Sequence, residues 1–145
     1  MIKCARIKNI YQKYVNFLTK YLASILLLAI RIFVGLVFFK SGLTKFSNVD
    51  QAIILFTYEY SVPILPPAFA AISSMFFELA CGGALIVGIF TRLAALPLIG
   101  MTLVIQIFVF QNPEHFYWLF LLATLAIYGG GIFSADKICS KIKCN

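Results

Sequence analysis

The stretch LLLAIRIFVGLVFFKSGLTKF, residues 26–46, decides the fold class, because an apolar run of this length can cross a bilayer as a helix. One ionisable residue, Arg31, interrupts the run, and Lys40 and Lys45 follow it. A charged side chain in hydrocarbon costs free energy unless it finds a partner, a water-filled cavity or a route to the interface. The stretch therefore predicts a transmembrane helix and, elsewhere in the chain, a group that neutralises Arg31.

Further apolar runs of similar length follow along the chain, which gives predicted spans near residues 22–46, 66–90, 93–111 and 116–134. The 145 residues are 62% hydrophobic and 12% charged, a composition outside ordinary soluble usage. Short turns favour neighbouring helices that run antiparallel. We expect a single all-α domain over residues 1–145, an integral membrane four-helix bundle.

Basic residues flank these apolar runs on one side. They lie before the first span, in the second turn and after the fourth span: Lys3, Arg6, Lys8, Lys13, Lys20, Arg92, Lys137, Lys141 and Lys143. The other connections carry Asp50, Glu59 and Glu114 instead. Because positive flanks stay in the cytoplasm, we expect both termini there. A net charge of +7 could also suggest nucleic acid, but that needs a basic face on a soluble fold, so no nucleic-acid partner is expected.

Two shorter helices are expected outside the spans. As a helix, residues 7–21 place apolar side chains on one side and several lysines on the other. This pattern is typical of an amphipathic helix at the inner membrane surface. Residues 50–67 predict a short outer interfacial or re-entrant helix that ends at Pro63, because proline disfavours helix in the residue before it. Pro66 and Pro67 then suit the first turn of the second span.

The charged residues of the first span share one face with small residues. At 100° per residue, one stripe contains Arg31, Gly35, Phe38, Gly42 and Lys45. In the second span, Ser74, Glu78 and Gly82 share a face at four-residue steps. Counted from the inner ends, Arg31 lies about 14 Å deep and Glu78 about 18 Å deep. We therefore predict that Glu78 pairs with Arg31 and fixes how the first two helices dock.

Two interpretations of this charge pair stay open. The pair either serves only to pack the helices, or it also touches a substrate or a proton. The second interpretation needs Glu78 to change protonation or the guanidinium to keep a free edge. Thr102 and Gln106, one turn apart in the third span, either complete a polar pocket or make ordinary hydrogen bonds between helices.

Other residues that could carry chemistry are sparse. The single histidine, His115, excludes paired-histidine haem ligation within one chain, and we interpret it as a surface residue at the outer rim. The four cysteines form no CxxC pair and no spacing typical of zinc, so no metal site is predicted. Without a phosphate loop or a nucleophile elbow, no catalytic residue is assigned.

Three stretches resemble the DoxX family of small bacterial four-helix membrane proteins: RIFVGLVFFKSGLTKF at 31–46, FELACGGALIVGIFTRLAALPL at 77–98 and, more weakly, YGGGIFSADKI at 128–138. The resemblance implies a multi-pass protein of the bacterial cytoplasmic (inner) membrane. In founding members it implies a subunit of quinone-linked oxidoreductases that act on reduced sulfur compounds. The positions of interest carried over by motif are Arg31, Gly35, Gly42, Lys45, Glu78, Gly82, Gly83, Thr91 and Arg92. The last two are expected at the inner surface, where Arg92 can bind anionic lipid.

Two functions follow from the residues and the resemblance together. The first is an accessory or quinone-interacting subunit of a membrane redox system; the sequence assigns no cofactor, and a quinone is the candidate that the resemblance offers. The second is a non-enzymatic scaffold or small-molecule transporter in which Arg31 and Glu78 only staple the helices. The expected partners are the lipid bilayer, a partner subunit of a redox complex and, as an alternative, a second copy of the chain.

Overall fold

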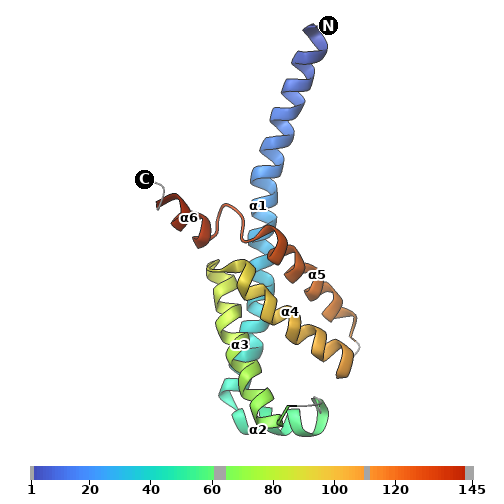
Figure 1. Cartoon of the computed structure of the whole chain (residues 1–145), viewed down its shortest axis with the longest axis vertical. Coiled ribbons are helices and arrows are strands. Elements are labelled where there is room, and N and C mark those ends of the chain that lie inside the picture. Colours follow the sequence, from blue (N-terminus) through green and yellow to red (C-terminus); the bar gives the residue numbers. More distant parts are fainter. Residues whose placement is uncertain (1, 61–64, 110–111, 143–145) are drawn as a thin grey trace.

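The computed structural model describes residues 2–60, 65–109 and 112–142, and every regular element within these ranges is a helix (Figure 1). The all-α prediction is thereby confirmed.

The first helix, α1 (Ile2–Ser47), has 46 residues, and its N-terminal part extends beyond the other helices (Figure 1). The prediction of a separate amphipathic helix over residues 7–21 is wrong, because α1 continues through this segment. Neither glycine nor proline occurs before Gly35, so no residue interrupts the helical hydrogen bonds. Ile10, Tyr14 and Phe17 are exposed along this part of α1, which keeps the predicted apolar side.

After α1 the chain forms α2 (Val49–Leu55) and one short π-helix, η1 (Phe56–Tyr60). The sequence predicts a short helix in this region, and its expected end at Pro63 lies outside the described residues. Ala52 and Phe56 are buried against two small residues of the next helix, Ala70 and Ala71. This contact holds η1 against that helix.

Helices α3 (Pro67–Val87) and α4 (Thr91–Phe108) are joined by a short turn. Pro67 stands in the first turn of α3, as predicted, and Gly88 ends the helix in the left-handed region with a φ of 83°. The predicted spans over 66–90 and 93–111 agree with these two helices to within one turn at each end.

The last two helices are α5 (Pro113–Tyr128) and α6 (Ala135–Ile142). Asn112 caps α5, since its side chain accepts a hydrogen bond from the Glu114 backbone N–H at 3.1 Å. The predicted span over 116–134 extends too far: Gly129 and Gly131 adopt φ values of 76° and 75° and end the helix.

Helix α1 packs along α3, α3 lies beside α4, and α5 contacts both α4 and α1. The buried apolar core between them consists of Val34, Phe38, Leu85, Ala94, Ala95, Leu98, Leu122 and Leu125. Within the described ranges three helical segments are long and apolar enough to cross a bilayer: Ile10–Ser47, Pro67–Val87 and Thr91–Phe108. Helix α5 has only 16 residues, so the fourth crossing stays a prediction.

Candidate functional site

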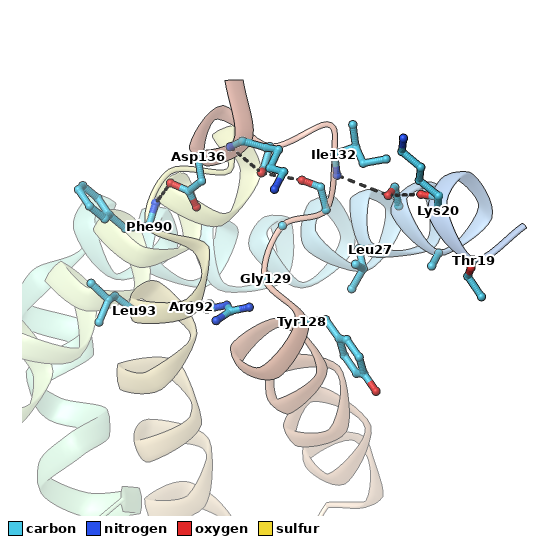
Figure 2. A pocket seen from close by; sticks show the side chains of 16 residues that line it. Thr19, Lys20, Leu27, Phe90, Arg92, Leu93, Tyr128, Gly129, Ile132 and Asp136 are labelled. Atoms are coloured by element: carbon cyan, nitrogen blue, oxygen red, sulfur yellow. Dashed lines mark hydrogen bonds between the residues drawn. The ribbon is translucent and has the colours of Figure 1, made fainter. Parts of the chain in front are cut away.

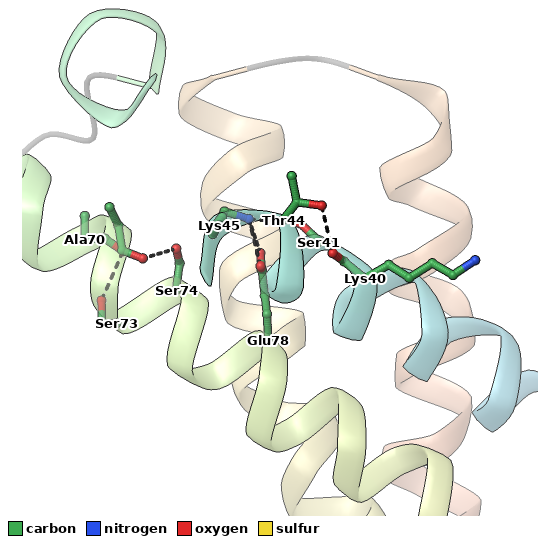
Figure 3. A network of polar contacts seen from close by, with 9 residues as sticks. Lys40, Ser41, Thr44, Lys45, Ala70, Ser73, Ser74 and Glu78 are labelled. Atoms are coloured by element: carbon green, nitrogen blue, oxygen red, sulfur yellow. Dashed lines mark hydrogen bonds and ion pairs between the residues drawn. The ribbon is translucent and has the colours of Figure 1, made fainter. Parts of the chain in front are cut away.

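An ion pair between Lys45 of α1 and Glu78 of α3 lies inside the helix packing (Figure 3). Lys45 Nζ donates to the two Glu78 carboxylate oxygens at 2.8 and 2.7 Å and to Ser41 Oγ at 2.9 Å. The two charged side chains are only 14% and 5% exposed. The ammonium can donate three hydrogen bonds, and this geometry uses all three. Lys40 points away from the pair, as the sequence predicts.

The predicted pairing of Arg31 with Glu78 is wrong, and the register of α1 on α3 explains why. A Cβ added at Gly35 would lie 3.0 Å from the Gly82 carbonyl oxygen, and one added at Gly42 would lie 3.1 Å from the Glu78 Cβ. Glu78 therefore lies level with the segment around Gly42, close to the lysine of the ion pair. Arg31 precedes Gly42 by three turns of helix, about 16 Å along the axis.

Arg31 instead lies beside Gly88, at the C-terminal end of α3. Its Nη1 donates to the Gly130 carbonyl oxygen and its Nη2 to the Phe133 carbonyl oxygen, each at 3.3 Å, and the residue is 2% exposed. The sequence-based depth is counted from residue 22, but α1 extends beyond the other helices there. Arg31 thus lies nearer the end of the helix packing than expected, where two loop carbonyl oxygens accept its hydrogen bonds.

Asp136 of α6 lies at this same end of the helix packing, and sequence reasoning missed it. Its carboxylate accepts hydrogen bonds from the backbone N–H groups of Phe90 at 2.7 Å and Thr91 at 3.0 Å, and from Thr91 Oγ1 at 3.2 Å. A carboxylate in this position stabilises α4, because the N-terminus of a helix carries a partial positive charge. Of the two residues expected at the inner surface, Thr91 is fully buried here, whereas Arg92 is exposed.

The small residues predicted to support the site lie along the contact between α1 and α3. Gly35, Gly42 and Gly82 are buried in this contact, where an added Cβ would meet backbone or tightly packed side chains. Gly83 lies beside it, and an added Cβ there would meet only the Phe39 ring, at 3.6 Å. Close approach of the two helix backbones is thus the role of three of these four glycines.

A cavity of about 200 Å³, which we call the polar cavity, adjoins the ion pair between α1, η1, α3, α4 and α5. Its lining residues are Val37, Phe38, Ser41, Lys45, Phe56, Tyr60, Ser74, Glu78, Thr102, Ile105, His115 and Trp118. The structure therefore brings together four of the predicted site residues, Lys45, Ser74, Glu78 and Thr102. Arg31 does not line it.

His115 lines the polar cavity, so its interpretation as a surface residue is wrong. It is half-buried, and its Nδ1 lies 2.9 Å from Gln106 Oε1 of α4, in hydrogen-bond contact. The His115 and Trp118 ring centroids are 5.2 Å apart. The three-residue spacing of these two side chains, which puts them on one face of a helix, is the signal that could have placed both at the cavity.

Tyr60 brings a phenol to the polar cavity from η1, outside the spanning helices. Burial raises the pKa of Tyr60, and the nearby Glu78 and Glu59 carboxylates raise this pKa further. The phenol therefore stays protonated and keeps its hydrogen-bond donor well above neutral pH.

An apolar groove of about 400 Å³ lies next to the polar cavity, between η1, α3 and α4. Phe56, Tyr60, Ser74 and Ile105 line both spaces. Most other groove residues are apolar, among them Phe77, Met101 and Val104. Together the two spaces suit an amphiphile with a compact polar head and an apolar tail.

Comparison with known proteins gives one finding. The family model described as DoxX matches residues 26–111, which is more than half of the chain. No curated protein and no solved structure matches it. The matched region includes the ion pair, Arg31 and the contact between α1 and α3, and its apolar helices are those of a multi-pass membrane protein. The chain belongs to the DoxX family.

Proposed function

We propose that this protein is a quinone-interacting subunit of a redox system in the bacterial cytoplasmic membrane. One observation carries the proposal: the polar cavity, with its buried Lys45–Glu78 ion pair, adjoins an apolar groove. A buried ion pair pays a desolvation cost that its attraction barely offsets, so stability alone is a weak reason to place one there. Ionisable residues inside the membrane more often mark a ligand or proton path.

The topology that goes with this function has four crossings and both termini in the cytoplasm. The basic residues in the first 20 positions and after α5 support this orientation, as do Asp50, Glu59 and Glu114 in the opposite connections. Helix α5, with 16 residues, spans about 24 Å, which is one or two turns less than the bilayer core, and local thinning can accommodate that difference. The polar cavity then lies toward the outer leaflet.

The residues present fit a quinone. A quinone head is a flat ring with two carbonyl acceptors. The Tyr60 phenol of the polar cavity can donate to one of them, and Lys45 Nζ can donate to the other if it gives up its hydrogen bond to Ser41 Oγ. Phe38 and Trp118, whose rings meet edge to face with centroids 6.0 Å apart, supply flat apolar surface. The apolar groove continues in the direction a hydrophobic tail would need.

A bound quinone would supply two-electron, two-proton redox chemistry, and this chain would bind and orient it. The Lys45 ammonium would polarise a carbonyl oxygen, while the Glu78 carboxylate holds that ammonium in place. Tyr60 would donate from a phenol that stays protonated. The apolar rings around the cavity would exclude water from the head.

Quantifying quinone that co-purifies with the protein tests this function. Wild-type protein in mild detergent should retain quinone in organic extracts, and both Glu78→Gln and His115→Phe should lose most of it. Lys40→Gln removes an exposed cation of the same helix and should retain the wild-type amount. Thermal stability is measured alongside, and His115→Phe leaves the ion pair intact, so loss of quinone is separable from loss of fold. Repeated wild-type preparations without quinone would overturn the proposal.

A second function, a scaffold or small-molecule transporter, is favoured by the completeness of the ion pair. The ammonium has three acceptors and both carboxylate oxygens have a donor without any ligand. A charge swap, Lys45→Glu with Glu78→Lys, separates the two functions. If the swap restores folding and the cellular phenotype together, the pair only staples the helices. Restored folding with a lost phenotype supports the ligand site.

A further inference from the structure

A larger cavity of about 660 Å³, which we call the basic cavity, opens where α3 turns into α4 (Figure 2). Its walls come from residues 19–27 of α1, the start of α4, the loop after α5 and the start of α6. It shares no lining residue with the polar cavity or the apolar groove. A ligand here would not overlap the proposed quinone.

Three cations from three helices line the basic cavity: Lys20 of α1, Arg92 of α4 and Lys137 of α6. Arg92 extends from α4 toward the loop at Gly129 (Figure 2). A Cβ added at Gly129 would lie 3.3 Å from Arg92 Nε, so the glycine leaves room for this side chain. A guanidinium in a cavity that further cations line suits a phosphate, which it can bind through two parallel hydrogen bonds.

Among the described residues that line the basic cavity, Asp136 is the one acid, and its carboxylate is already hydrogen-bonded. Both of its carboxylate oxygens accept hydrogen bonds from the start of α4. The lining thus carries more positive than negative charge, and its carboxylate faces the helix N-terminus. A negatively charged ligand is favoured over a cation.

Part of the remaining wall is apolar and continues onto the outside of the helices. Leu27 and Leu93 line the basic cavity, and Leu93 and Phe90 are 63% and 67% exposed on a surface that a bilayer covers. A soluble anion gains nothing from such a wall, whereas an acyl chain does. We propose that the basic cavity binds the phosphate headgroup of an acidic membrane phospholipid, with Arg92 at the phosphate, Lys20 adding positive charge on the opposite side of the cavity and an acyl chain along Leu93.

Native mass spectrometry of the purified protein tests this proposal. The protein in detergent is mixed with equal amounts of phosphatidylglycerol and phosphatidylcholine of different chain lengths, so that each bound lipid has its own mass. Wild-type protein should bind phosphatidylglycerol in preference. Arg92→Gln and Lys20→Gln should each weaken that binding about fivefold, the usual worth of one cation near an acidic lipid.

Lys13→Gln is the matched control, because it removes one exposed cation of α1 that does not line the cavity. It should keep the wild-type preference, and an equal loss in this variant would overturn the proposal by showing a general surface-charge effect. Inorganic phosphate at millimolar concentration distinguishes the two sources of the anion: if it displaces the lipid completely, the cavity binds free phosphate and the lipid proposal fails. If Arg92→Gln does not fold, Lys20→Gln alone decides.

Discussion

Replacing one member of the Lys45–Glu78 pair should cost far more free energy of unfolding than replacing both. At the observed 2.7 Å separation the attraction amounts to about 6 kcal/mol for an effective dielectric constant of 20. Burial opposes this attraction, because each ion loses several kcal/mol of hydration. The two contributions are of similar size, so the intact pair adds little net stability.

Lys45→Met leaves a carboxylate and Glu78→Met leaves an ammonium, each without its partner in a buried site. Each single variant should lose about 3–5 kcal/mol, the usual cost of an uncompensated buried charge. The double variant removes both charges and keeps similar side-chain volume, so it should lie within about 1–2 kcal/mol of wild type. The unfolding free energy is measured by titrating the protein in mixed micelles with a denaturing detergent, followed by circular dichroism. Lys40→Met is the control for an exposed lysine on the same helix.

If each single variant costs less than about 1 kcal/mol and the two costs add, the pair is not desolvated and the reasoning fails.

Three further predictions concern the contact between α1 and α3 and the hydrogen bonds that Asp136 and Arg31 make near the C-terminal end of the chain. Gly82→Ala should lose about 1–3 kcal/mol in the same titration, because the new methyl would lie 2.9 Å from the backbone nitrogen of Phe39. Gly83→Ala, its matched control, should be neutral or slightly stabilising, and equal losses in both would contradict the close contact. Asp136→Ala should speed hydrogen exchange of the first amides of α4 by about tenfold, the effect of losing a charged acceptor worth about 1.4 kcal/mol. Arg31→Met should leave two loop carbonyls without donors and expose the segment after α5 to proteolysis, whereas unchanged cleavage would show that Arg31 does not hold this loop.

Much of the fold is predictable from the sequence because each helix has a local cause. Pro67 and Gly88 bound α3 close to its predicted ends. The absence of glycine and proline before Gly35 and the glycines after Tyr128 are local signals of the same kind for α1 and α5, although the predicted boundaries of these two helices did not use them. The stripe that runs from Arg31 to Lys45 is turned inward, as its 100° spacing predicts, and its two glycines and Lys45 contact α3. Which residues share a face depends on the geometry of a single helix, so the amino-acid sequence is enough to predict it.

The partner of a buried charge depends instead on how two helices slide past each other. Glu78 had Arg31 and Lys45 as candidates on the same stripe, and the choice follows from contacts such as that of Gly42 with Glu78. The register of one helix on another is a property of the tertiary structure. It cannot be determined by counting residues from the assumed ends of the spans. Asp136 was missed for the same reason, since its partners lie in another helix and a sequence separation of 46 residues divides it from Phe90.

Fluorescence of Trp118, the single tryptophan of the chain, tests quinone binding in the polar cavity most directly, because this residue lines the cavity. Decylubiquinone is titrated into the protein in lipid nanodiscs, with Glu78→Gln as the site variant. A Trp118→Phe, Phe120→Trp variant reports from a position that is 72% exposed. Binding in the cavity predicts saturable quenching in the wild type, its loss in Glu78→Gln and only linear, collisional quenching of the tryptophan at 120. Linear quenching of the same strength at both tryptophan positions would contradict it.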